Sequence, residues 1–238
     1  MNRQPSVLFH PYKALGLICT EVPFVVRPLP KQKINTVLCA VGNVVQQYNA
    51  QSLRLISVSD PLPQKITVIA CDKLYVYVAF GSCVAALHLS RKVKYMFKGH
   101  HSNDINLLLP FGHHLITVDA SSKICVCDIE SQELYVQIDQ DSNVFAITAL
   151  CHPITYLNKI LFGSRQGQLR IINVKTGRLV HEFAGWSSGV SALVQSPAVD
   201  VVAIGLEDGR IVLHNLKFDE TLFTFRQDWG RVAGVGFR

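Results

Sequence analysis

The feature that most constrains the fold of this chain is an internal repeat. Five segments open on a similar apolar stretch, at Ile66, Ile105, Ile147, Val190 and Val232, and they follow one another at intervals of 39, 42, 43 and 42 residues. Self-similarity at about 40 to 45 residues is the spacing of four-stranded propeller blades. At that period the chain of 238 residues holds roughly 5.7 units.

Each unit divides into short apolar runs closed by turn residues, as four strands require. Between the second and third runs of one unit, Ser164-Arg165-Gln166-Gly167 predicts a tight turn in which glycine takes a positive φ without strain. Glu207-Asp208-Gly209 repeats this turn in the next unit. We therefore assign structural roles to Gly167 and Gly209. The strands predicted for the first of these units are 147–150, 159–163, 168–173 and 178–183.

The second run of several units is apolar at consecutive positions, as in 36–41, 74–79 and 199–204. Such strands are covered on both faces. Between them we find no window of ten or more residues with the apolar spacing of a helix, so neighbouring blades must supply the cover. The sequence therefore predicts an all-β propeller of four-stranded blades.

One unit retains the two ends of a recognisable repeat signature. Gly99-His100 precedes a segment, 115–129, that ends with Cys127-Asp128 in the position of a Trp-Asp dipeptide. The units are therefore interpreted as degenerate WD repeats. In such repeats the histidine can join a hydrogen-bond network with an aspartate of the following tight turn, and the matching position here is near Asp119 to Ser121. We therefore expect His100 and Asp119 to be structural, with a binding role for His100 as the alternative. We also expect Asp128 to be structural.

The last repeat stops after one predicted strand. We expect residues 1–23 to form an N-terminal segment and residues 24–238 to form part of a first WD-repeat propeller, incomplete, with about five blades plus the first strand of a sixth. Closed propellers contain whole blades, so we expect a piece of a longer chain that exposes an unpaired sheet edge. The units are approximately 24–59, 66–100, 105–140, 147–186, 190–229 and 232–238.

Composition limits the class of protein. Hydrophobic residues make up 49% of the chain and charged residues 17%, which excludes a disordered chain. The seven cysteines are odd in number and none lies in a C-x-x-C spacing, so a reducing compartment is expected. No apolar run reaches the roughly eighteen residues that a membrane span needs. We expect a soluble intracellular protein with no membrane partner.

No group of residues in the sequence forms a convincing catalytic or metal site. His113-His114 lacks a third ligand at a recognisable spacing. Cys151 and His152 are adjacent in sequence, which is no evidence that the imidazole approaches the thiol in space. We therefore assign no catalytic, cofactor or metal-binding residue and expect neither enzymatic activity nor a small-molecule substrate.

Basic residues give the one direct indication of a partner. The net charge is +6, and Arg91, Lys92, Lys94 and Lys98 lie close together in the sequence. Counterion release makes such clusters effective on phosphate backbones. No run of five occurs, however, and aromatic residues are not interleaved with the cations. These four are candidate RNA contacts, with solvated turns and strand edges as the alternative.

From about Leu8 to the end, the chain resembles the WD repeat-containing protein 36 family, also called the small nucleolar RNA-associated protein 21 family. Generic WD repeats do not share the strings that carry this resemblance. They are Leu8-Phe9, 14–17, 110–112, His152-Pro153, 155–161, 197–206, 220–222 and 225–230.

The resemblance implies a non-catalytic scaffold subunit of the small-subunit processome, which supports processing of the precursor of small-subunit ribosomal RNA in the nucleolus. The implied partners are other propeller subunits and, with direct contact left open, pre-ribosomal RNA or a small nucleolar ribonucleoprotein. The alternative function is a WD-repeat adaptor that recruits proteins in another pathway. A propeller enzyme ranks last, because acidic residues are few and fall mainly in turns.

Overall fold

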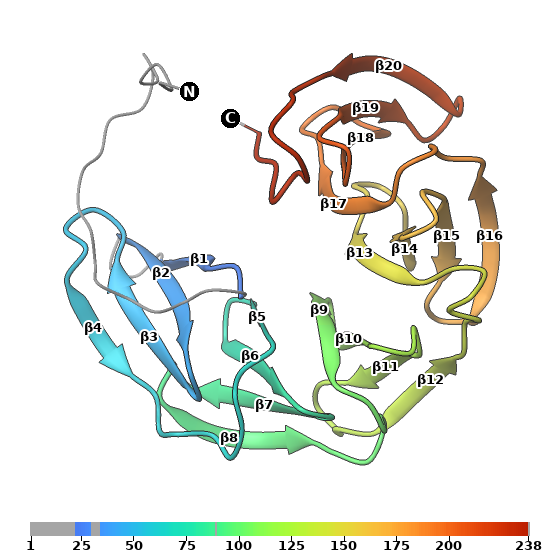
Figure 1. Cartoon of the computed structure of the whole chain (residues 1–238). Coiled ribbons are helices and arrows are strands. Elements are labelled where there is room, and N and C mark those ends of the chain that lie inside the picture. The colour runs from blue at the N-terminus through green and yellow to red at the C-terminus, as the bar shows by residue number, and fades with distance from the viewer. Residues whose placement is uncertain (1–21, 30–33, 89, 238) are drawn as a thin grey trace.

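The computed structural model describes residues 22–29, 34–88 and 90–237. In these ranges the regular structure is twenty strands, with no helix, arranged as five four-stranded antiparallel sheets. Each strand pairs with the next one along the chain, so every sheet is a simple meander. The five blades form a ring, with the first strand of each blade toward the centre and the fourth at the outside (Figure 1). The all-β propeller prediction is confirmed.

The strand bounds follow the repeat. Blade 1 contains β1 (Val25–Leu29), β2 (Ile34–Val41), β3 (Val44–Asn49) and β4 (Leu55–Val58). Blade 2 contains β5 (Val68–Cys71), β6 (Tyr75–Phe80), β7 (Cys83–His88) and β8 (Lys92–Phe97). Blade 3 contains β9 (Ile105–Phe111), β10 (His114–Asp119), β11 (Ile124–Asp128) and β12 (Leu134–Ile138). Blade 4 contains β13 (Ile147–Cys151), β14 (Lys159–Ser164), β15 (Leu169–Asn173) and β16 (Arg178–Phe183), and blade 5 contains β17 (Val190–Gln195), β18 (Val201–Leu206), β19 (Ile211–Asn215) and β20 (Glu220–Phe225).

The second strand of each blade is buried on both faces, as β6 illustrates. Val76 and Val78 pack in a cluster shared with blade 1. Tyr77 and Ala79 point the other way, into a cluster shared with blade 3. All four are fully buried, which explains why the strand is apolar at every position. Neighbouring blades supply the cover, as the sequence predicted.

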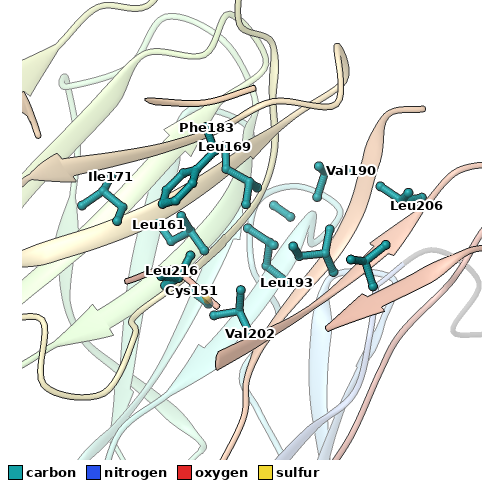
Figure 2. Close-up of a cluster of buried hydrophobic side chains, with 13 residues drawn as sticks. Cys151, Leu161, Leu169, Ile171, Phe183, Val190, Leu193, Val202, Leu206 and Leu216 are labelled. Atoms are coloured by element: carbon teal, nitrogen blue, oxygen red, sulfur yellow. The ribbon is translucent and has the colours of Figure 1, made fainter. Parts of the chain in front are cut away.

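Blades 4 and 5 meet in the same manner (Figure 2). Leu161 and Phe183 of blade 4 face Leu193 and Val202 of blade 5, and each of these side chains is at most 8% exposed. Burying one such side chain contributes about 1.5–3 kcal/mol. The hydrophobic core of the protein is therefore divided into layers, one between each pair of adjacent blades.

A hydrogen bond that recurs in three of the repeats links one blade to the start of the next repeat. The second residue of a repeat carries a hydroxyl group that donates to the carbonyl oxygen of the first residue of the following repeat. These bonds run from Thr67 to Ile105, Thr148 to Val190 and Ser191 to Val232, at 2.6, 2.5 and 2.8 Å. The repeat period therefore corresponds to a repeated contact between blades.

The first residue of the sixth repeat packs against blade 5, although the strand predicted there does not form. Val232 is buried, and its N–H donates to the carbonyl oxygen of Leu206 at 3.1 Å. Residues 232–237 have no strand assignment, because no described strand lies beside them to pair with. Of the predicted N-terminal segment 1–23, residues 1–21 lie outside the described part of the chain.

The outer strand of blade 5 differs from its counterparts in burial. Phe97 and Phe183 end the outer strands of blades 2 and 4 and are 3% and 1% exposed. Phe225 occupies the same register position in blade 5 and is 50% exposed. No described segment packs over this face of blade 5, so an aromatic side chain at a core position of the repeat lies at the surface.

Candidate functional site

The buried polar network of the WD repeat forms in blade 3, but with a different histidine from the one we predicted. His101, not His100, places its Nδ1 3.0 Å from Oδ2 of Asp119 and its Nε2 2.6 Å from Oγ1 of Thr117. All three side chains are buried. His100 is half-buried and contributes its backbone carbonyl, which accepts from the thiol of Cys125. The glycine before His100 has φ +79°, and the turn it makes presents the second histidine to the carboxylate.

The charge state of this network follows from its burial. Desolvation lowers the pKa of His101 below its usual value, against the opposing effect of the nearby carboxylate. Desolvation alone would raise the pKa of Asp119, but hydrogen bonds from Ser121, His101 and Lys123 outweigh it and lower the pKa. A neutral imidazole that donates its Nδ1–H to an ionised carboxylate, and accepts the Thr117 hydroxyl at Nε2, satisfies both groups. The network holds the β10–β11 turn rigid.

A second structural device recurs at the end of the third strand of four blades. An Asn or Asp side chain there accepts two backbone N–H groups of the following turn. Asp128, predicted to be structural, accepts from Glu130 at 3.0 Å and Ser131 at 2.8 Å. The equivalent residues are Asn49, Asn173 and Asn215, each bonded to the residues two and three positions ahead. This device closes the turn between the third and fourth strands.

Gly167 and Gly209 lie in tight turns between second and third strands, with φ of +91° and +89°. A Cβ on Gly167 would collide with the carbonyl oxygens of Trp186 and Ser188, so the turn packs against the connection between blades 4 and 5. Ser122 holds the equivalent position in blade 3 with φ +69°, and its hydroxyl accepts the N–H of Ile147 at 2.9 Å.

Three of the four candidate RNA contacts lie at one end of blade 2 and the fourth does not. Arg91 is in the turn before β8, while Lys92 and Lys94 are on β8, and all three are exposed. Lys98 follows the far end of β8. A strand rises about 3.3 Å per residue, which places it roughly 20 Å from Lys92. Lys73, in the β5–β6 turn, is a further exposed cation at the same end as Arg91.

Strand pairing brings aromatic side chains to this end of blade 2. Tyr75 is opposite His88, and His88 is opposite Lys92, so the three residues form a row across β6, β7 and β8. The ring of Tyr75 lies 6.2 Å from that of His88 and 5.3 Å from that of Tyr95. His88 is exposed and both tyrosines are half-buried. We call this surface, made of Lys73, Tyr75, His88, Arg91, Lys92 and Tyr95, the blade 2 base.

A buried arginine of blade 1 fixes the two turns of the blade 2 base. Arg27 is 4% exposed, and its guanidinium donates to the carbonyl of Lys73 at 3.0 Å and to the hydroxyl of Ser90 at 3.4 Å. Among the described residues no carboxylate forms an ion pair with Arg27, and its Nε has no hydrogen-bond partner. Arg27 therefore places a buried positive charge beneath the exposed cations.

Cys125, Cys127 and Cys151 are core residues rather than reactive groups. Burial raises the pKa of Cys125 to about 11 and that of Cys127 and Cys151 to about 12, so these thiols are protonated at neutral pH. The ring of His152 bonds to the carbonyl of Tyr156 at 3.2 Å. Within the described residues, no group of three His, Cys, Asp or Glu side chains could hold a metal ion. In the same residues no helix has the length and hydropathy that crossing a bilayer requires.

The sequence did not single out Arg27, Tyr75, His88 and Tyr95. The three aromatic residues are 13 and 7 positions apart along the chain and meet only through the antiparallel register. One signal was available. When the repeats are aligned, blade 2 has His88 where the other four blades have Asn or Asp.

Comparisons with known proteins agree with this fold. Residues 37–238 match the family model for the WDR36/Utp21 first β-propeller. Human WD repeat-containing protein 36 is 44% identical over 237 residues, which cover all of this chain and 26% of the human protein. The U3 small nucleolar RNA-associated protein 21 homolog of Schizosaccharomyces pombe is 33% identical over 98% of this chain, and its Saccharomyces cerevisiae counterpart is 24% identical over 98%. The chain spans about a quarter of the length of these relatives.

Proposed function

Because the chain belongs to the WDR36/Utp21 family, we propose that it is a non-catalytic scaffold subunit of the small-subunit processome. In this role it supports processing of small-subunit pre-ribosomal RNA in the nucleolus, chiefly through protein contacts. One observation carries the proposal: the two yeast relatives are named for association with the U3 small nucleolar RNA and align with nearly the whole chain. A role in ribosome biogenesis follows from those names.

The geometry is compatible with a scaffold. The fourth strands of the blades line the outside of the ring, and most of their residues are exposed. Exposed apolar side chains such as Leu55, Tyr135, Leu179 and Phe223 lie on these strands, at 53%, 51%, 52% and 55% exposure. Outer strands of this kind offer backbone and apolar contacts to other propeller subunits, which are the partners we propose.

A non-catalytic role is supported by the state of the nucleophilic side chains. The thiols of Cys125, Cys127 and Cys151 in blades 3 and 4 are buried and protonated. The buried pair of His101 and Asp119 bonds within blade 3. A catalytic base requires access to a substrate proton. We therefore infer that the polar groups of the interior stabilise blades.

Affinity isolation of the tagged chain from its own cells tests the proposal. The expected result is co-isolation of small-subunit pre-ribosomal RNA with U3 RNA, and sedimentation of part of the chain with large nucleolar particles. An unrelated WD propeller of similar size and charge, carrying the same tag, is the control. Recovery of a different protein assembly without these RNAs would favour the adaptor alternative and overturn the proposal.

A further inference from the structure

We propose that the blade 2 base binds a single-stranded segment of RNA. Bases stack on His88 and Tyr75, with Tyr95 packed behind Tyr75, and phosphates lie against Lys73, Arg91 and Lys92. This inference rests on the proposed function and deepens it, because it gives the scaffold a direct RNA contact and assigns it to one blade. The argument depends on four features of that end of blade 2.

The first feature is the aromatic row. Tyr75 and His88 are paired across adjacent strands, and Tyr95 closes on Tyr75 at a ring distance of 5.3 Å in an edge arrangement. The hydroxyl of the neighbouring Tyr77 donates to Asp72 at 2.9 Å and anchors the inner end of the cluster. Tyr75 and Tyr95 pack against the cluster between blades 2 and 3, and the Tyr95 hydroxyl is buried. His88 is exposed and Tyr75 is half-buried, so these two rings reach the surface. Aromatic faces of this kind stack on bases of any sequence.

The second feature is the charge around the row. Lys73, Arg91 and Lys92 are exposed, and two aspartates lie nearby. One of them, Asp72, accepts hydrogen bonds from the N–H groups of Leu74 and Tyr75 and from the hydroxyl of Tyr77, so its carboxylate is held by groups of blade 2. The other, Asp60, donates its backbone N–H to the carbonyl of Arg91 at 3.0 Å. The cations outnumber the carboxylates, as a phosphate backbone requires.

The third feature is Arg27, which lies beneath this surface. Its guanidinium fixes the β5–β6 and β7–β8 turns through the carbonyl of Lys73 and the hydroxyl of Ser90. Arg27 therefore links Lys73 of one turn to Ser90 of the other, next to Arg91. The buried guanidinium adds positive charge beneath this surface, and that charge attracts an anion above it. The site is thus prepared for negative charge.

The fourth feature is the departure of blade 2 from its own repeat. The other four blades end their third strand with an Asn or Asp that caps the following turn, and blade 2 has His88 at that position. The turn that follows is also shorter, with three residues between β7 and β8. When one repeat lacks a stabilising cap that the others keep, we expect that position to have another role.

Blade 3 provides a matched control within the same chain. His114 and Tyr135 form a comparable pair, with ring centroids 5.1 Å apart. Their surroundings are acidic instead of basic, because Asp128, Glu130 and Glu133 occupy the adjacent turn. A pair of aromatic rings without cations should not hold RNA, so variants of this pair separate specific binding from general effects of removing an aromatic side chain.

The experiment measures binding of a fluorescein-labelled ten-nucleotide oligouridylate to the whole 238-residue chain by fluorescence anisotropy. His88→Ala should weaken binding about tenfold, within the range for loss of one stacked base. Tyr75→Leu, which retains an apolar side chain for packing, should act in the same direction. Lys92→Ser should reduce the slope of log affinity against log salt by about 0.7. Tyr135→Leu and Lys175→Ser should leave affinity and slope within twofold of the wild-type values.

Three outcomes would overturn the inference. They are absence of binding by the wild-type chain at low salt, equal losses in the blade 3 control variants, and displacement of the probe by polyglutamate with no dependence on His88 or Tyr75. The last outcome indicates an acidic protein partner. Thermal unfolding of each variant shows whether it is folded. Co-isolation with nucleolar particles is a separate readout, so the scaffold proposal survives a failure here.

Discussion

Among single changes in a turn, removal of the Asp119 carboxylate should lower the free energy of unfolding most. Its side chain is fully buried and accepts four hydrogen bonds. They come from Nδ1 of His101 at 3.0 Å, the N–H and hydroxyl of Ser121 at 2.9 and 2.6 Å, and the N–H of Lys123 at 3.1 Å. Asp119→Ala leaves the imidazole and backbone donors without partners inside the protein.

The magnitude follows from that geometry. An unsatisfied buried donor costs about 1–3 kcal/mol, and Asp119→Ala leaves several such donors at once, the neutral His101 imidazole among them. We therefore expect Asp119→Ala to lower the free energy of unfolding by about 3–5 kcal/mol. In a chain of this length each kcal/mol shifts the melting temperature by about 2–4 °C, so the midpoint should fall by roughly 6–20 °C. Asp119→Asn keeps an acceptor oxygen for the turn and should cost about 1–2 kcal/mol.

Far-ultraviolet circular dichroism during urea and thermal unfolding measures these changes. Asp208→Ala is the matched control, because Asp208 also lies in a turn between second and third strands. Its side chain is 39% exposed and pairs with Arg210 at 2.7 Å. This exposed pair is expected to contribute less than about 1 kcal/mol. The reasoning is refuted if Asp119→Ala remains within about 1 kcal/mol of the wild type, or if the Asp208 variant loses as much stability.

Three further predictions concern turns and pH. Gly167→Ala should lower the free energy of unfolding by at least about 2 kcal/mol, since a Cβ meets backbone at a φ of +91°; an unchanged urea midpoint would contradict the close approach. Gln132 and Gly177 both have positive φ, of 65° and 70°, which glycine adopts more easily than other residues. Gln132→Gly should therefore raise the free energy of unfolding by about 0.5–1 kcal/mol, and Gly177→Ala should lower it by about 1 kcal/mol. A urea-midpoint shift of the opposite sign in either variant would count against this. Burial lowers the pKa of His101 and His214 in the folded chain, so the unfolded chain takes up protons first as the pH falls below about 6.5. The free energy of unfolding should therefore decline by at most about 1.4 kcal/mol per pH unit for each histidine. Urea midpoints at pH 7.5 and 5.5 measure this decline, and a higher midpoint at pH 5.5 would contradict it.

The blades could be predicted from the sequence because the repeat appears directly in the residue pattern. The strands expected in the unit from Ile147 agree with the observed bounds to within one residue at each end. The strand expected at Val232 did not form, because a strand needs a neighbour and the described chain offers none there. A periodic pattern thus predicts where strands can form, and pairing decides whether they do.

The polar network shows the limit of a signature match. Two histidines follow Gly99, and the repeat signature selected His100. The conformation of that turn decides which ring reaches Asp119, and a shift of one residue in a loop leaves no trace in the pattern. The blade 2 base shows a different limit. Tyr75, His88 and Tyr95 are separated in sequence, so a search for aromatic residues interleaved with cations could not detect a cluster assembled by strand pairing.

Ultraviolet crosslinking of the tagged chain in its own cells tests the central claim most directly, because it asks which residues touch RNA and which RNA they touch. The account predicts nucleotide adducts on peptides that contain Tyr75, His88 or Tyr95, and recovery of small-subunit pre-ribosomal RNA with the chain. Adducts confined to other blades, or recovery of the chain without that RNA, would contradict it.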